Sequence, residues 1–174
     1  MRRPLLASIV ATLAGAAAIA HAQEPISALK GHDSNAPVDV TADRIEVQDR
    51  ADRAVFVGNV HVRQADLTLD TSRLTVAYSS AGGIQIQRLD ASGGVVVRSP
   101  SETARGNFGV YDLNRKLITL VGDVQLSRGD SRLYGARLVI DLASGRAVVD
   151  GGPAGVGQRG GRVTGHFTVP RRDN

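Results

Sequence analysis

The side chains best suited to catalysis or metal binding in this chain are its four histidines. His21 lies at the end of an apolar N-terminal run, and His32, His61 and His166 are far apart, so no two of them have the spacing of metal ligands. We expect the last three to be exposed on strands or loops. The chain contains no cysteine, which excludes disulfides, thiolate nucleophiles and thiolate metal ligands.

The carboxylates are better explained by turns than by catalysis. Asp112 and Asp141 each directly follow a strand's apolar pair, and Asp49 comes after the strand residues Ile45 and Val47; an aspartate at such a place stabilises a turn. The sequence has no nucleophile-elbow serine motif, no phosphate-binding loop and no dinucleotide-binding glycine pattern. We therefore predict no catalytic residues, no metal, no cofactor and no enzymatic activity, and a hydrolase remains a distant alternative.

The elements that position the remaining side chains are β-strands, because apolar and polar residues alternate along the chain. In residues 118–127 every second residue is apolar or glycine, a period of two that is typical of a half-buried strand. The same alternating pattern occurs in residues 54–62 and 89–97, and a weaker copy of it in residues 147–151. No stretch after the first 22 residues has helical periodicity.

The copies of this pattern are about 30 residues apart, which indicates an internal repeat. A unit this small cannot bury its own apolar face, so the units must stack. Each copy carries a glycine (Gly58, Gly93, Gly122 and Gly151), and a glycine inside a strand indicates a bulge or bend. We predict an all-β fold with two antiparallel sheets face to face, an open, twisted sandwich or jelly roll of many short strands.

The chain divides into four segments. Residues 1–22 combine two arginines, an apolar run and an Ala-His-Ala site, which predicts a secretory signal peptide cleaved before Gln23 and a periplasmic protein. The alternative, an uncleaved membrane anchor, is weakened by a run shorter than the roughly 20 residues that span a bilayer. Residues 23–36 form an irregular leader, residues 37–150 the β-domain, and residues 151–174 a Gly-rich linker with a basic tail.

The composition argues against a nucleic-acid partner. The formal net charge is +4, but the excess of arginine lies at the two ends of the chain and not in the predicted β-domain. The chain has three Phe, three Tyr and no Trp, so it offers few rings on which bases could stack, and the core must be aliphatic.

Four runs occur in order across residues 37–150, namely Pro37–Ile45, Val57–Val62, Gly106–Asp112 and Leu120–Val124. In this order and spacing they resemble the LptA/OstA family of periplasmic lipopolysaccharide-transport proteins. The resemblance implies a slightly open β-jelly roll that holds lipopolysaccharide acyl chains. It also implies end-to-end association that bridges an LptC-like inner-membrane protein to the N-terminal domain of an LptD-like outer-membrane protein. The Gly-rich, Arg-ended tail departs from the family pattern.

The resemblance places Val38, Val40 and Tyr111 at the lipid, and the alternation extends this set to an apolar inner face. The predicted lipid-binding residues are Val38, Val40, Ile45, Val47, Phe56, Val60, Val62, Leu74, Val76, Val95, Val97, Phe108, Val110, Tyr111, Ile118, Leu120, Val124, Leu126, Leu138 and Ile140. A closed aliphatic core without a cavity is the structural alternative. The functional alternatives are an LptC-like relative that keeps residues 5–20 as an anchor and a secreted structural or carbohydrate-binding β-sandwich, which the scarcity of aromatic residues argues against.

The terminal strands of such a fold leave unpaired N–H and C=O groups. The candidate ends are the strand that begins at Val38 and a last strand in residues 138–149 or 163–169. Joining the last strand of one molecule to the first strand of the next would give head-to-tail self-association.

Overall fold

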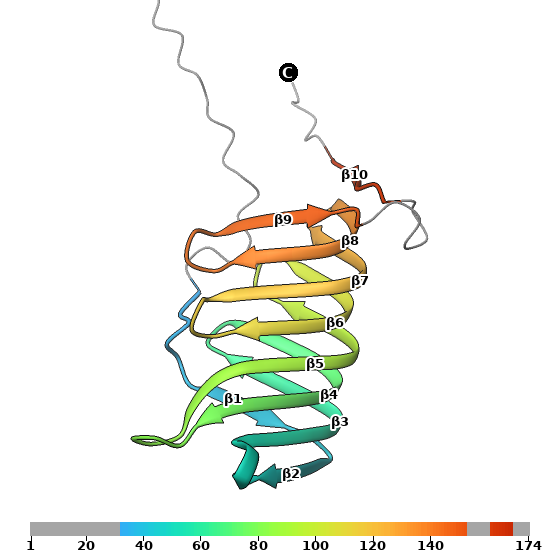
Figure 1. Ribbon diagram of the computed structural model, residues 1–174. Coiled ribbons are helices and arrows are strands. Elements are labelled where there is room, and N and C mark those ends of the chain that lie inside the picture. Colours follow the sequence, from blue (N-terminus) through green and yellow to red (C-terminus); the bar gives the residue numbers. More distant parts are fainter. Residues whose placement is uncertain (1–31, 153–160, 169–174) are drawn as a thin grey trace, which may run out of the picture.

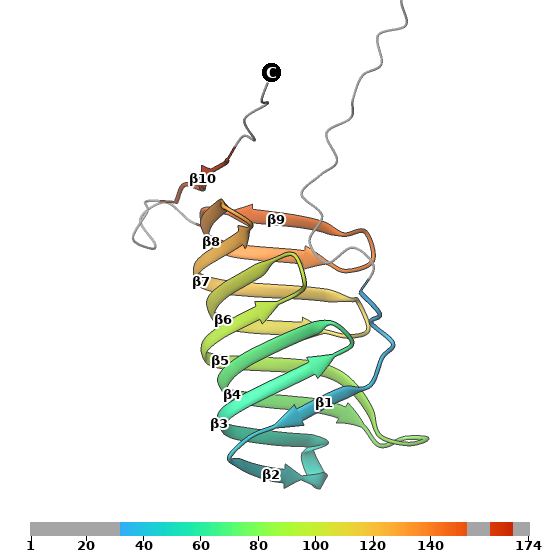
Figure 2. The same cartoon turned by 180° about the vertical axis from the view of Figure 1, so that it is seen from behind.

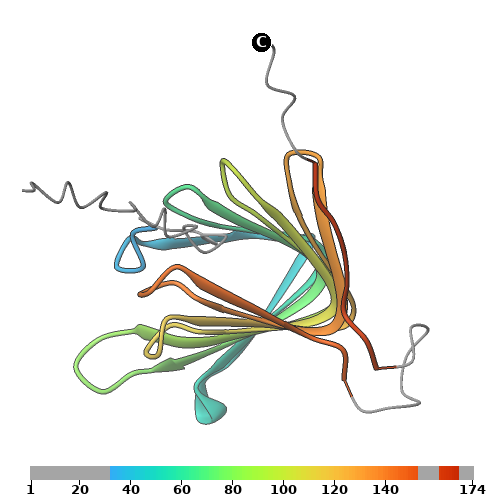
Figure 3. The same ribbon diagram turned by 90° about the horizontal axis from the view of Figure 1, so that it is seen from above.

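The computed structural model describes residues 32–152 and 161–168, which form one antiparallel sheet folded into two facing walls (Figures 1 and 3). The strands are β1 (Val38–Thr41), β2 (Arg44–Gln48), β3 (Arg53–Gln64), β4 (Leu67–Ser79), β5 (Gln85–Arg98), β6 (Thr103–Asp112), β7 (Leu117–Arg128), β8 (Ser131–Asp141), β9 (Arg146–Asp150) and β10 (Thr164–His166). A short 3-10 helix, η1 (Asp49–Ala51), joins β2 to β3. The predicted all-β jelly-roll class is confirmed.

Strands β3 to β8 pair in order, and each of them runs through both walls. At one end of the stack, β1 pairs with the second half of β3 (Val38 opposite Gln64), and β2 pairs with the first half (Ile45 opposite Phe56). At the other end, β9 and β10 pair with the two halves of β8. We call the two walls the β1 wall and the β2 wall, after the strand that ends each of them. The β1 wall faces the viewer in Figure 2.

The bend between the walls is made by glycine bulges in alternate strands. In β3, β5 and β7 two consecutive residues have positive φ, namely Gly58–Asn59, Gly93–Gly94 and Gly122–Asp123. The pairing register shifts beside each of these pairs, because the bulged strand carries one extra residue. The predicted bends at these three glycines are confirmed. The fourth is not, since β9 ends at Asp150, before Gly151.

The bulged strands keep one alternation through the bend, but the strands between them do not. In β7, the residues Ile118, Leu120, Val124 and Leu126 are all buried, as the alternation predicts. In β4 and β6 two consecutive residues at the bend point outward. The alternation therefore shifts by one residue at the bend: even-numbered positions face inward on one side of it and odd-numbered positions on the other. In β4 this bend falls at Ser72 and Arg73, inside an unbroken strand.

This shift of the alternation places two residues of β6 on the outer face that the sequence predicted on the inner face. Phe108 is 59% exposed and Val110 is only half-buried, whereas Gly109 and Tyr111 face the interior. Asn107 and Phe108 are the two consecutive outward residues at the bend. The inward orientation predicted for Phe108 and Val110 is therefore wrong.

Candidate functional site

The space between the two walls holds most of the predicted lipid-binding residues. Those that are buried there are Val60, Val62, Leu74, Val76, Val95, Val97, Tyr111, Ile118, Leu120, Val124, Leu126, Leu138 and Ile140. Val38, Val40 and Phe56 are partly buried and pack against this cluster. The residues that alternate along the strands thus form a continuous, largely aliphatic face from both walls.

Two predicted residues lie outside this enclosed space. Ile45 and Val47 on β2 are 54% and 60% exposed. Their partners across the ladder are Phe56 and Ala54, which pack against the core, so both side chains continue the inner face beyond its covered part. Their predicted inner-face position agrees with this pairing, and they stay exposed on β2, the last strand of its wall.

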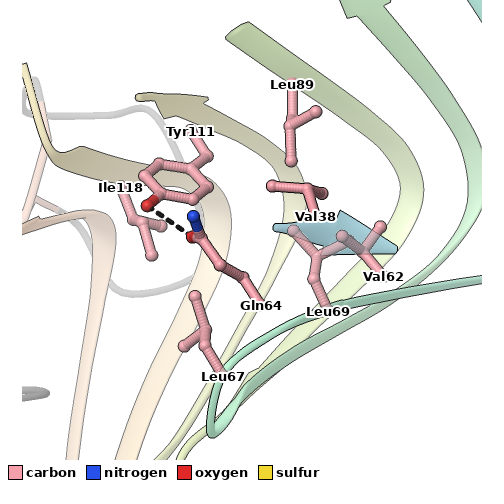
Figure 4. Close-up of a pocket in the computed structure, with 8 residues that line it drawn as sticks. All are labelled: Val38, Val62, Gln64, Leu67, Leu69, Leu89, Tyr111 and Ile118. Carbon is pink, nitrogen blue, oxygen red and sulfur yellow. Dashed lines mark hydrogen bonds between the residues drawn. The ribbon is translucent and has the colours of Figure 1, made fainter. Parts of the chain in front are cut away.

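A small cavity lies between the walls near the N-terminal end of β1 (Figure 4). Its lining residues come from both walls and are Val38, Val62, Gln64, Leu67, Leu69, Leu89, Tyr111 and Ile118. The cavity volume is about 10 Å³, about the size that admits one water molecule. This space is too small for an acyl chain, which would fit here only if the walls moved apart.

One hydrogen bond crosses this cavity between the walls. The Tyr111 hydroxyl, on β6 in the β2 wall, donates to Gln64 Oε1, on β3 in the β1 wall, at 2.8 Å (Figure 4). Both residues are 2% exposed. The Gln64 Nε2 group donates in turn to the backbone carbonyls of Ser34 and Ala36, each at 3.0 Å. Gln64 thus ties both walls to the segment that precedes β1.

His32 completes this polar cluster. Its ring nitrogens lie 2.9 Å from Asp66 Oδ1 and 3.2 Å from Gln64 Oε1, and its side chain is 1% exposed. The prediction that His32 is exposed is therefore wrong, because its partners come from the end of β3 and the following turn. His61 is exposed, as predicted, and lies 2.7 Å from Asp70 Oδ1; His166 on β10 is exposed as well.

The sequence offered one signal for this cluster. Gln64 continues the inner alternation of Val60 and Val62, and a polar residue at an inner position must find hydrogen-bond partners. Those partners were not predictable, since they come from parts of the chain 28 to 47 residues away.

Burial and hydrogen bonding shift the acidity of two groups near this region. Burial raises the pKa of the Tyr111 phenol, and a hydrogen bond with the Ser34 side chain lowers it by less. Partial burial, the largest single influence, raises the pKa of the Asp70 carboxyl. Hydrogen bonds and charges from His61 and Arg98 together outweigh it and hold that pKa below its usual value.

Over residues 32–152 and 161–168, no group of three or more His, Asp or Glu side chains is arranged to hold a metal ion. In the same residues no helix is long and apolar enough to cross a membrane. The predicted signal peptide, most of the leader, most of the Gly-rich linker and the basic tail with Arg171 and Arg172 lie outside the described residues.

Three comparisons place the chain among known proteins. A family model described as LptA/(LptD N-terminal domain) LPS transport protein matches residues 39–146. An uncharacterized protein of Rhizobium meliloti (strain 1021) is 31% identical over 154 residues, which covers 83% of this chain and 82% of that protein. The crystal structure of LptH, the LptA-homologous periplasmic component of the lipopolysaccharide transport device of Pseudomonas aeruginosa, superposes with a TM-score of 0.69. It is 17% identical, and the match covers 79% of this chain and 99% of that one.

The structural match supports the fold alone, because its sequence identity is low. The family match spans most of β1 to the beginning of β9, the part of the chain that builds both walls and the bends between them. The chain belongs to the LptA/(LptD N-terminal domain) family of lipopolysaccharide transport proteins.

Proposed function

We propose that this protein binds the acyl chains of lipopolysaccharide between its walls and carries the lipid from the inner toward the outer membrane. One observation supports this proposal most. An aliphatic inner face continues across strands β3 to β8 and emerges uncovered at Ile45 and Val47. A lipid could therefore be passed along the stack from one end to the other without exposing its chains to water.

The binding energy would come from covering methylene groups, each worth about 0.8 kcal/mol when removed from water. The small cavity would have to widen for this. The walls are joined along the bend and hydrogen-bond to each other at the far side through Tyr111 and Gln64. Opening would turn the walls about the glycine bulges, and the side chains of the closed core would then contact lipid.

The two ends of the stack would dock neighbouring proteins by strand addition. β1 and β2 end one side of the sheet, and β9 and β10 end the other. Each end presents backbone groups to a new strand. A contact between the unlike ends of two molecules leaves a free end on each of them, so the assembly grows as a filament and does not close into a dimer. The partners we propose are an LptC-like inner-membrane protein, the N-terminal domain of an LptD-like outer-membrane protein, and further copies of this chain head to tail.

We further propose that residues 1–22 are an export signal removed before Gln23, so that residues 23–36, 37–150 and 151–174 act in the periplasm as leader, β-domain and tail. Sequencing the N-terminus of the exported protein tests this assignment. A start at Gln23 is expected, and retention of residues 5–20 would favour the membrane-anchored relative. In this proposal the protein acts by binding alone and catalyses no reaction.

Depletion of the protein in its host tests the transport role. Newly made lipopolysaccharide, followed by pulse labelling and membrane fractionation, is expected to accumulate at the inner membrane. Delivery to the outer membrane at the normal rate would contradict the proposal. Re-expression of the full chain serves as the control and should restore delivery.

A further inference from the structure

The segment ahead of β1, residues 32–36, lies beside β1 at the open side of the two walls (Figure 3). We call it the strap. It is held in place by the cluster around Gln64 and by a local turn, in which the Ala36 amide donates to the Asp33 carbonyl and the Asn35 amide to Asp33 Oδ1. The strap thus has a defined conformation beside Gln64, one of the residues that line the cavity.

The strap saturates the polar groups of the cavity. The side-chain amide of Gln64 donates both of its hydrogens to strap carbonyls, those of Ser34 and Ala36. Its oxygen lies within hydrogen-bond distance of Tyr111 in the opposite wall and of His32 in the strap. One buried side-chain amide therefore links the strap and both walls, and the walls cannot part while all of these bonds are kept.

The carbonyl groups that Gln64 binds have a chemical equivalent in the ligand of the proposed function. An acyl chain is joined to its headgroup through an ester or amide carbonyl, which accepts N–H donors as a peptide carbonyl does. A buried amide that loses its partners must find new ones, because an unsatisfied polar group in an apolar site is costly. A lipid that enters between Leu67, Leu89 and Ile118 would bring such carbonyls to the polar end of the cavity.

We propose that the strap is a displaceable lid on the lipid cavity, and that Gln64 exchanges the strap carbonyls for the acyl-linkage carbonyls of the bound lipid. This inference rests on the proposed function. It adds a moving segment, and it makes Gln64 the residue that distinguishes acylated lipids from alkyl chains without a carbonyl. The chemistry that it recognises is an acyl ester or amide at the edge of an apolar slot.

A spin label on the strap tests the displacement. The chain has no cysteine of its own, so Asn35→Cys, at an exposed strap position, gives a single labelling site in the exported protein. Added lipopolysaccharide should mobilise this label with the same midpoint as binding, measured separately by equilibrium dialysis. A label at Asn114→Cys, in the exposed turn between β6 and β7, is the matched control and should not respond.

The Gln64→Met variant tests the exchange of partners. Its strap label should be mobile before lipid is added. Its preference for lipopolysaccharide over an alkyl maltoside, whose chain carries no carbonyl, should fall about fivefold or more, as expected for losing one to two hydrogen bonds. His32→Ala, which alters the strap and neither wall, should mobilise the label too and keeps the test available if Gln64→Met does not fold. His61→Ala, in the exposed pair with Asp70, is its control.

The possible outcomes separate the two proposals. A strap label that stays immobile while wild-type protein binds lipopolysaccharide would overturn the strap and leave the proposed function standing. An unchanged lipid preference in Gln64→Met would overturn the role of Gln64 as the discriminating residue. Wild-type protein that binds no lipopolysaccharide would overturn the proposed function itself, and the strap proposal with it.

Discussion

The hydroxyl of Tyr111 and the side-chain oxygen of Gln64 lie 2.8 Å apart, and their hydrogen bond joins the two walls across the cavity. Both side chains are buried in an interior that is mostly aliphatic. A buried hydrogen bond of this kind is costly to break, so it sets the closed arrangement of the walls. The lipid pathway that we propose must open at this contact.

Replacing Tyr111 by phenylalanine should loosen the closed state. The variant keeps the ring in the cavity but removes the donor to Gln64, which should lower the free energy of unfolding by about 1–2 kcal/mol. Urea unfolding measures the change. Tyr78→Phe is the matched control, because the Tyr78 hydroxyl makes an exposed contact of 3.4 Å with Asp49, and it should unfold as the wild type does. Equal stability of all three proteins would contradict a structural role for the cross-wall bond.

The bend at Gly122 should tolerate no side chain. Gly122 has φ 83°, and a Cβ there would lie 2.8 Å from Asn107 Nδ2 on the neighbouring strand. Gly122→Ala should therefore cost about 1–3 kcal/mol of crowding in addition to the positive-φ penalty. Gly82→Ala is the control, since Gly82 has φ 81° and nothing within 4 Å of a Cβ. If the two variants unfold at the same urea concentration, crowding at the bend is refuted.

The alkaline stability of the protein should depend on Tyr111. Burial raises its pKa above the ordinary value of about 10, so the unfolded phenol ionises first. The stabilisation is complete below that value and is lost as the pH rises through the pKa of the folded state. Urea unfolding of wild type and Tyr111→Phe from neutral to strongly alkaline pH should show their stability difference shrinking as the phenol ionises. A difference that grows with pH would show that the sign is wrong.

The uncovered end of the β2 wall should govern self-association. Ile45→Asp places a charge on an exposed apolar residue, so the monomer should keep its stability within about 0.5 kcal/mol. Concentration-dependent oligomers, measured by sedimentation velocity, should weaken. Ile84→Asp is the control, because Ile84 is 77% exposed in the loop between β4 and β5 and belongs to no end strand of the stack. A loss of oligomers in the Ile84 variant alone would place the contact elsewhere.

The sequence predicted the inner face of β3, β5 and β7 because a glycine bulge adds a residue and keeps the alternation constant. It failed in β6, where the alternation shifts by one at Asn107–Phe108 and no bulge marks the change. The residues that do face inward beside the bend are Gly106 and Gly109, which have no apolar side chain. Phe108 and Val110 were therefore predicted as the inner pair, because they are the apolar residues nearby. A Cβ at Gly109 would lie 3.0 Å from Leu120 Cδ2, so the packing of the bend, and not hydrophobicity, selects these positions.

The polar cluster of His32, Gln64 and Tyr111 could not be predicted from the local sequence pattern. His32 and Gln64 are 32 residues apart, and Tyr111 is a further 47 residues along the chain. Nothing local distinguishes His32, which is buried in the strap, from His61, which pairs with Asp70 on the outer surface. Only the pairing of β1 with β3 brings the strap to Gln64, and that pairing depends on the whole sheet.

We propose that the inner face of the folded sheet contacts lipopolysaccharide, and a photo-crosslinking amino acid placed at Val124 or at Gln125 measures this contact. Val124 is 1% exposed between the walls, and its neighbour Gln125 points to the outer face. In cells that make lipopolysaccharide, the probe at position 124 is expected to form a covalent lipopolysaccharide adduct upon irradiation, and the probe at position 125 is expected to form none. Equal labelling at both positions, or labelling at position 125 alone, would show that the inner face is not the lipid site.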